Sequence, residues 1–266
     1  MRRGFHPWLP LLVPALAFAV VMAGWEFAVA QGWLRRLLFP PPTRLFSSAV
    51  ELAREGVPVG KTLLDHLLVT IARIFGGFIA AVALAVPLGL VIGASPFLDR
   101  MMAPIVGFCR SVATLSLLPL ALVWFGIGEA SKIFLIGYGC FWVMLSNVIA
   151  AMHLVDPVLL RAARTMDTAP LRTFTHVVLP AALPRIAAGA RIALGVGFMV
   201  IVGAEMIGTT TGLGALIMEA RTFYRTDVTM VGMVTIGLLG LAISMSLSRL
   251  ERRMMPWMPV ESGARQ

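Results

Sequence analysis

Long apolar segments alternate with short polar segments along the whole chain. Uncharged runs cover residues 74–98, 133–152 and 228–248, and three further apolar runs carry one charge each, at Glu26, Arg110 and Glu205. A helix needs roughly 20 apolar residues to cross the core of a bilayer. The pattern therefore predicts six transmembrane helices, at about 8–30, 68–94, 103–126, 133–153, 187–208 and 228–248.

The composition supports an all-α membrane protein. The chain has 266 residues, of which 59% are hydrophobic and 13% are charged, whereas soluble domains carry about 25% charged residues. A soluble helical core with this composition would leave too little polar surface to keep the chain dissolved. We therefore expect residues 1–266 to form a single transmembrane domain with short polar ends.

The first apolar segment also has features of a signal peptide. Arg2 and Arg3 give a basic start, and residues 28–30 have the small side chains of a cleavage site. The apolar region is longer than the roughly 7–15 residues of a signal peptide, and Glu26 interrupts it late. We expect this segment to be retained as a membrane span.

The distribution of basic residues predicts the orientation. With six spans, both termini lie on one side, and that side holds twelve arginines against eight lysines and arginines on the other. Basic residues are enriched in cytoplasmic loops, so we expect both termini to be cytoplasmic, although the basic loop 34–61 weakens the bias. The net charge of +9 suits contact with anionic lipid and requires no nucleic acid.

Residues 155–186 form the longest polar loop predicted on the cytoplasmic side. Asp156 and Pro157 are a typical helix start, Thr168 and Pro170 repeat that signal, and Pro180 is expected to end the second helix. The second helix carries one apolar stripe, formed by Leu171, Phe174, Val177 and Val178. An amphipathic helix of this kind binds a groove on another protein, or else lies on the membrane surface.

Thr43 is expected to cap a helix that runs through Glu55 on the outer membrane face. Within the spans, Gly89 and Gly93 are four residues apart, which allows close packing of two helices.

A few polar residues lie inside the predicted spans. Glu205 should face a protein interior or a wet cavity. We favour a structural hydrogen bond to the third or fourth span over a role in the pathway or gate. If Glu205 has this structural role, glutamine should be tolerated at position 205. Arg110 either attracts an anion or extends to the nearer interface. Ser111, Thr114 and Asn147 either line a polar conduit or bridge helices.

Enzymatic motifs are nearly absent. Residues 56–62 resemble a phosphate-binding loop but lack one residue before Gly60, and Pro58 interrupts them. The four histidines have no metal-ligand spacing. We expect the chain to have no ATPase site, cofactor or metal of its own and to take its energy from a partner or a gradient. An ion-driven secondary transporter and a non-transporting assembly protein remain alternatives.

The loop carries the pattern of a coupling motif. Arg161-Ala162-Ala163, Asp167 and Val177-x-Leu179-Pro180 resemble the Glu-Ala-Ala…Gly…Ile-x-Leu-Pro motif of bacterial ABC importer permeases. Arg161 replaces the glutamate of the motif, and Asp167 replaces its glycine. Asp tolerates left-handed backbone better than most residues, so the turn can be retained, whereas the charge reversal puts one polar contact in doubt.

Further stretches resemble the nitrate/sulfonate/taurine family of these permeases, and its taurine and sulfonate members most. The matching segments, in chain order, are 37–42, 118–132, 203–205, 212–214, 226–228 and 252–257.

This resemblance implies a type I (MetI-like) permease in the bacterial inner membrane. It implies a homodimer that binds two copies of an ABC ATPase, which uses ATP, and receives a small anion from a periplasmic binding protein. The residues that it implies for ATPase coupling are Arg161, Ala162, Ala163, Asp167, Leu171, Phe174, Val177, Leu179 and Pro180.

Overall fold

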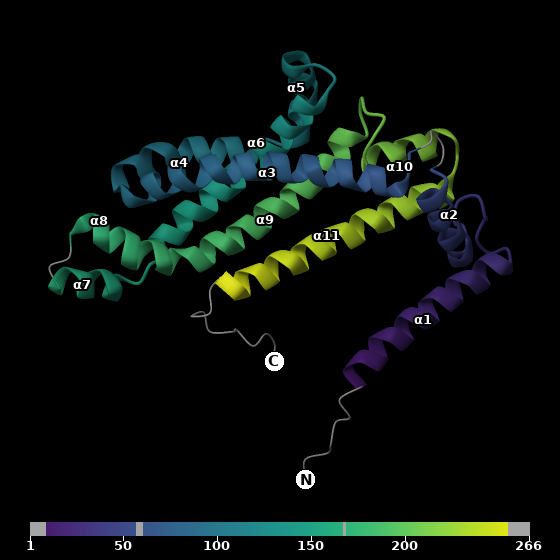
Figure 1. The fold of residues 1–266 in the computed structure, drawn as a ribbon, viewed down its shortest axis with the longest axis horizontal. Coiled ribbons are helices and arrows are strands. Elements are labelled where there is room, and N and C mark those ends of the chain that lie inside the picture. The colour runs from purple at the N-terminus through teal and green to yellow at the C-terminus, as the bar shows by residue number, and fades with distance from the viewer. Residues whose placement is uncertain (1–8, 57–60, 167–168, 255–266) are drawn as a thin grey trace, which may run out of the picture.

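The computed structural model describes residues 9–56, 61–166 and 169–254, and all secondary structure in these ranges is helical. The helices are α1 (Leu9–Ala30), α2 (Pro42–Arg54), α3 (Leu63–Ala94), α4 (Pro96–Ser111), η1 (Thr114–Leu117), α5 (Leu118–Phe125), α6 (Glu129–His153), α7 (Pro157–Thr165), α8 (Pro170–Thr173), η2 (Phe174–Val178), α9 (Leu179–Glu205), α10 (Leu213–Thr222) and α11 (Thr226–Met254). Figure 1 shows α7 and α8 at one end of an elongated bundle and α2 and α10 at the opposite end.

The core of the bundle is formed by α3, α6 and α9, with α6 packed extensively against each of the other two. Glycines allow α3 to approach α6 closely, because a Cβ at Gly89 would lie 2.7 Å from Val148, and one at Gly93 would lie 2.7 Å from Met152. The Gly89/Gly93 pair therefore faces a neighbouring helix, as its spacing predicts. The large residues that it contacts belong to α6.

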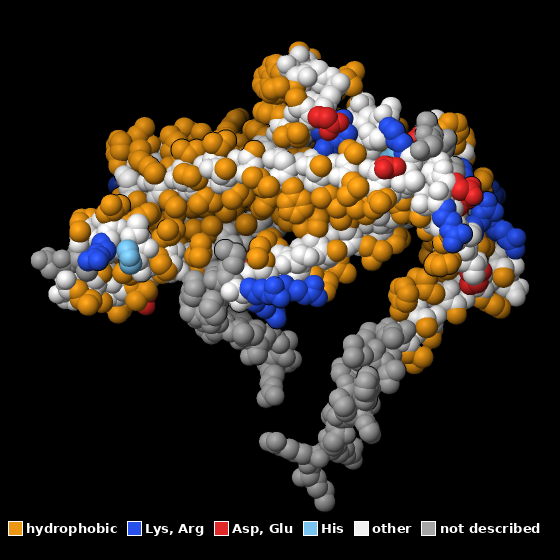
Figure 2. Space-filling model, viewed as in Figure 1, with side chains coloured by type: hydrophobic (Ala, Val, Ile, Leu, Met, Phe, Trp, Pro, Cys, Tyr) orange, Lys and Arg blue, Asp and Glu red, His pale blue; other side chains and the backbone are white. Residues whose placement is uncertain are grey.

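Four helical segments within the described residues are long and apolar enough to cross a membrane: 63–94, 129–153, 170–205 and 226–253. The helices α4 and α5 together pass the same test as one bent pair, and residues Leu16–Ala30 of α1 form a further apolar helical stretch. Figure 2 shows apolar side chains covering the long flank of the bundle, with charged groups gathered toward its ends, at the base of α5 and at the C-terminal end of α11. The count of six spans stays a prediction.

The segment predicted as one span at 103–126 is broken in the structure. Helix α4 ends at Ser111, and α5 begins at Leu118 after the short 3-10 helix η1; the two directions differ by 80°. Two successive residues, Val112 and Ala113, adopt extended backbone. Pro119 lies in the first turn of α5, where its missing N–H costs no hydrogen bond, and so it favours a new helix start there.

Thr43 does not cap α2, which has Pro41 at its N-cap. The Thr43 hydroxyl instead donates to the Glu26 carboxylate at 2.9 Å, and the Thr43 backbone N–H donates to it at 3.3 Å. These bonds join α2 to α1, which lies apart from the rest of the bundle (Figure 1). The single charge of the first apolar segment is thereby hydrogen bonded.

Candidate functional site

The predicted coupling segment forms one end of the bundle. The Asp156 carboxylate accepts the backbone N–H of Val158 at 2.8 Å, as expected for the start of α7. The second helix begins at Pro170 with Ala169 at its N-cap. Asp167 and Thr168 lie outside the described residues.

The predicted coupling residues differ in their exposure to solvent. Leu171 is 76% exposed, and Arg161 and Ala162 are also exposed. Phe174 packs against the main core, and Ala163 is buried. The predicted apolar stripe is therefore divided: Leu171 faces outward, whereas Phe174 and Val178 hold the segment against the bundle. Val177, Leu179 and Pro180 are half-buried.

The prediction that Pro180 ends the second helix is wrong. Helix α8 continues through the π-helical turn η2 into α9, so 170–205 is one helical segment. In the π-turn the backbone N–H of Leu179 donates to the carbonyl of Phe174, five residues earlier. Pro180 follows this wider turn in the first turn of α9, where a residue without an N–H is tolerated.

A cluster of charges lies toward the other end of the bundle, around Glu205; Arg73, Lys132 and Glu205 are buried in it, whereas Glu129 is exposed. The Glu205 side chain is fully buried, and its carboxylate accepts from Arg73 Nη1 at 2.7 Å. The Thr70 hydroxyl lies 2.9 Å from both carboxylate oxygens, and the backbone N–H of Gly214 donates at 3.0 Å. Glu205 thus joins the end of α9 to α3 and α10, not to the third or fourth span as the sequence analysis expects.

Arg73 links this carboxylate to a second one. Its Nε and Nη2 each lie 2.5 Å from an oxygen of Glu129, in the first turn of α6, and its Nη1 also donates to the carbonyl of Thr211 at 2.7 Å. Lys132 Nζ lies 3.6 Å from Glu129. The four side chains carry two positive and two negative charges, so the cluster is neutral.

The pattern of charges along the sequence does not mark Arg73 or Glu129 as members of a site. Both flank uncharged runs, and charges at such positions are typical of residues at the membrane surface. In the structure, however, the Arg73 side chain is buried and only 3% exposed. The available signal was Glu205 itself, because a buried carboxylate requires a cationic or hydrogen-bonding partner on another element.

Glycines in the loop between α9 and α10 complete the cluster. Gly212 has φ +124°, and a Cβ at that position would collide with the Glu205 carboxylate. His66 Nδ1 lies 3.1 Å from the backbone nitrogen of Gly212 and 2.9 Å from its carbonyl oxygen. Only glycine fits this combination of backbone conformation and close approach.

A second polar group joins α2 to α11 at the same end. Asp227 accepts from the Ser48 hydroxyl at 2.8 Å and from Arg225 at 3.1 Å, and Arg225 also lies 3.6 Å from Glu51. The hydrogen bond to Asp227 raises the pKa of Arg225, because it favours the charged guanidinium. This group borders a hollow of about 330 Å³.

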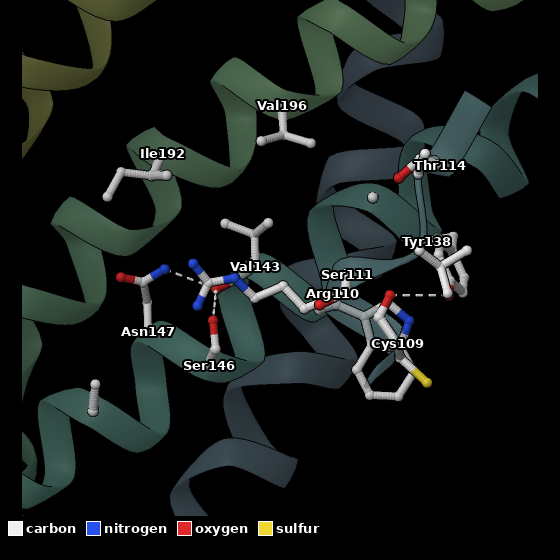
Figure 3. A pocket seen from close by; sticks show the side chains of 15 residues that line it. Cys109, Arg110, Ser111, Thr114, Tyr138, Val143, Ser146, Asn147, Ile192 and Val196 are labelled. Carbon is white, nitrogen blue, oxygen red and sulfur yellow. Dashed lines mark hydrogen bonds between the residues drawn. The ribbon is translucent and has the colours of Figure 1, made fainter. Parts of the chain in front are cut away.

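Four of the five predicted pathway residues lie around one cavity of about 580 Å³: Arg110, Ser111, Thr114 and Asn147. Glu205 is not among its lining residues. The cavity lies beside the middle of α6 and α9, where Tyr138, Ser146 and Ile192 contribute to its wall. Figure 3 shows the Arg110 side chain extending from the end of α4 toward Ser146 and Asn147.

The chain is similar to known transport proteins along most of its length. The family model described as "Binding-protein-dependent transport system inner membrane component" matches residues 85–258. The taurine transport system permease protein TauC of Escherichia coli (strain K12) is 35% identical over 239 residues, which cover 90% of this chain and 87% of the relative. The putative aliphatic sulfonates transport permease protein SsuC of the same strain is 33% identical over 259 residues, which cover 97% of each chain.

The fold also matches a solved structure. A chain of the MetNI methionine ABC transporter in inward-facing conformations superposes with a TM-score of 0.62 at 24% identity, covering 72% of this chain and 95% of the other. This agreement supports the MetI-like architecture. The family matches exclude the secondary transporter and the assembly protein that the span pattern alone left open. The chain belongs to the binding-protein-dependent transport system inner membrane components and is a multi-pass permease subunit of an ABC importer.

Proposed function

We propose that this permease imports a small anion of the sulfonate class, such as taurine, with nitrate or a similar anion as the alternative. The observation that carries the proposal is the similarity to a taurine permease over 90% of the chain. The cavity beside Arg110 supports it, because a guanidinium is suited to bind sulfonate oxygens.

The working unit that we propose contains two copies of this chain and two ATPase subunits, with a periplasmic binding protein on the outer side. In this arrangement ATP is bound and hydrolysed by the ATPase subunits alone. The exposed Leu171 supports ATPase binding at the α7–α8 end, since an apolar side chain is well suited to a groove on a partner. The hollow between α2 and α11 lies at the end where the binding protein would dock.

The proposed mechanism is alternating access. Closure of the ATPase dimer moves α7 and α8, and the unbroken segment from α8 into α9 carries that movement toward the outer end. Arg110, Ser111, Thr114 and Asn147 line the path. Glu205 has a structural role in this scheme, because its carboxylate is fully buried and ties the end of α9 to α3 and α10.

Reconstitution tests the proposed function directly. The permease, its ATPase and its binding protein are placed in liposomes, and ATP hydrolysis is measured with taurine, ethanesulfonate and nitrate in turn. We expect a sulfonate to stimulate hydrolysis several-fold only when the binding protein is present. Stimulation by nitrate alone would favour the alternative substrate, and no stimulation by any anion would contradict the proposal.

The orientation gives a separate prediction. In a chain whose Cys109 and Cys140 are replaced by serine, Phe46→Cys is expected to react with a membrane-impermeant maleimide in sealed cells. Pro170→Cys is expected to react only after the cells are permeabilised, because the α7–α8 end is cytoplasmic in the proposed orientation. Rapid labelling of Pro170→Cys in sealed cells would reverse the topology.

A further inference from the structure

We infer that the cavity beside Arg110 is itself a binding site for a small organic oxyanion with one negative charge, of the alkanesulfonate class. The inference rests on the proposed function for its ligand class. It adds that the permease itself binds the anion part-way across the membrane and has its own ligand preference. Selectivity would then not rest with the binding protein alone.

The first argument is the charge of the cavity. Fifteen residues line it, and Arg110 is the only charged one among them. Within the described part of the chain, Arg110 makes no hydrogen bond or ion pair with another protein group, in contrast to the fully paired Arg73. A guanidinium binds an oxyanion through two parallel N–H donors. The cavity thus offers one positive charge that no protein group in the described residues compensates.

The second argument is the set of neutral groups near the guanidinium. Ser146 Oγ and Asn147 Nδ2 both donate to the carbonyl of Val143, at 2.9 and 2.8 Å. These bonds fix the Asn147 amide on the side of α6 that Arg110 approaches (Figure 3). An amide nitrogen carries two hydrogens, so Asn147 retains one donor for a ligand oxygen.

The third argument is the shape and polarity of the remaining wall. Ile192 and Val196 of α9 supply an apolar surface opposite the polar groups, and Figure 3 shows both side chains across the cavity from Arg110. The volume of about 580 Å³ is within the range of about 300–1,000 Å³ that is typical of ligand pockets. An anion with an oxyanion head group and a short alkyl tail fits this cavity, because the head group can bind the polar side and the tail can contact the apolar side.

The absence of acidic lining residues sets the charge of the preferred ligand. None of the residues around the cavity is an aspartate or a glutamate. A dianion would leave its second charge unpaired, and the ammonium group of a zwitterion such as taurine would find no carboxylate. We therefore expect ethanesulfonate to bind this site more tightly than taurine, which has the same head group.

Direct binding tests the site. The probe is ethanesulfonate, titrated calorimetrically into the purified permease–ATPase complex without binding protein or nucleotide. We expect saturable binding that Arg110→Gln weakens by about tenfold or more. Asn147→Asp should weaken it similarly, because the new carboxylate pairs with Arg110 while keeping the size of the side chain. The matched control is Arg100→Gln, an exposed arginine of α4 outside the cavity lining, which should leave the affinity unchanged.

The outcomes separate this inference from the proposed function. Equal ethanesulfonate affinity in wild type, Arg110→Gln and Asn147→Asp would overturn the site, as would tighter binding of taurine than of ethanesulfonate. The site would also be overturned if the complex did not bind ethanesulfonate although a sulfonate stimulated its ATPase in the full reconstitution. The proposed function would stand in that case. Binding that depends on Arg110 in a complex that no sulfonate stimulates would support the site and contradict the proposed function.

Discussion

Replacing Glu205 by leucine is expected to lower the free energy of unfolding of the permease by about 3–5 kcal/mol, the usual effect of removing one partner of a buried ion pair. Arg73 would keep its ion pair with Glu129, but the hydroxyl of Thr70 and the backbone N–H of Gly214 would lose their acceptor. Thermal unfolding of the purified protein in detergent measures the change. Glu55→Leu is the matched control, because Glu55 is exposed.

The Glu205→Gln variant is expected to be intermediate in stability between wild type and Glu205→Leu, so glutamine is tolerated less well than the sequence alone predicts. The carboxylate accepts from three donors, Thr70 and Arg73 of α3 and the backbone N–H of Gly214 in α10, whereas an amide presents one oxygen and a nitrogen that donates. At least one buried donor is then left unsatisfied, which costs about 1–3 kcal/mol. The double variant Arg73→Leu/Glu205→Leu should lose less than the sum of its single variants. Strict additivity, or a Glu205→Leu protein as stable as wild type, would contradict a structural role.

Leu171→Asp is expected to reduce the amount of ATPase that copurifies with the permease by about tenfold or more, while the permease still inserts and folds. Leu171 is 76% exposed at the α7–α8 end, so a charge there does not disturb the bundle but enters the proposed apolar contact, where it is strongly unfavourable. Copurification from the membrane fraction, scaled to the recovered permease, provides the measurement.

Two other positions make this experiment specific. Phe46→Asp places the same charge at an equally exposed apolar residue of α2, at the opposite end, and should leave the recovery of ATPase unchanged. Ala163→Asp is expected to act differently, because Ala163 is buried and a carboxylate there would disturb α7 itself. Full ATPase recovery and full transport in Leu171→Asp would remove this segment from the coupling mechanism.

The long helices could be predicted from the sequence because their signal is local. Uncharged runs of 20 residues or more coincide with α3, α6 and α11, and the capping pattern at Asp156 locates the start of α7. The break between α4 and α5 could not be predicted in the same way. No charge or glycine marks Val112 and Ala113, and only Pro119 hints that a helix begins nearby.

The candidate site was predictable only in part. The sequence singles out Glu205 and Arg110 because charges inside apolar runs are costly. The sequence does not identify the residues that these charges contact. Arg73 lies 132 residues away from Glu205 along the chain, and the two meet only because α3 packs beside α9. Pro180 was misinterpreted for a related reason: proline usually ends a helix, and its effect here depends on a π-turn that no local pattern announces.

The π-turn has a mechanical consequence. Because Phe174–Val178 widens the helix without interrupting it, the 36 residues from Pro170 to Glu205 form a single rod, about 54 Å long at 1.5 Å per residue. One end of the rod presents Leu171, and the other end carries the carboxylate that Arg73 holds. In the proposed mechanism, a push or twist applied to the first end is therefore expected to reach the ion pair at the second end as strain, because the helix between them is continuous.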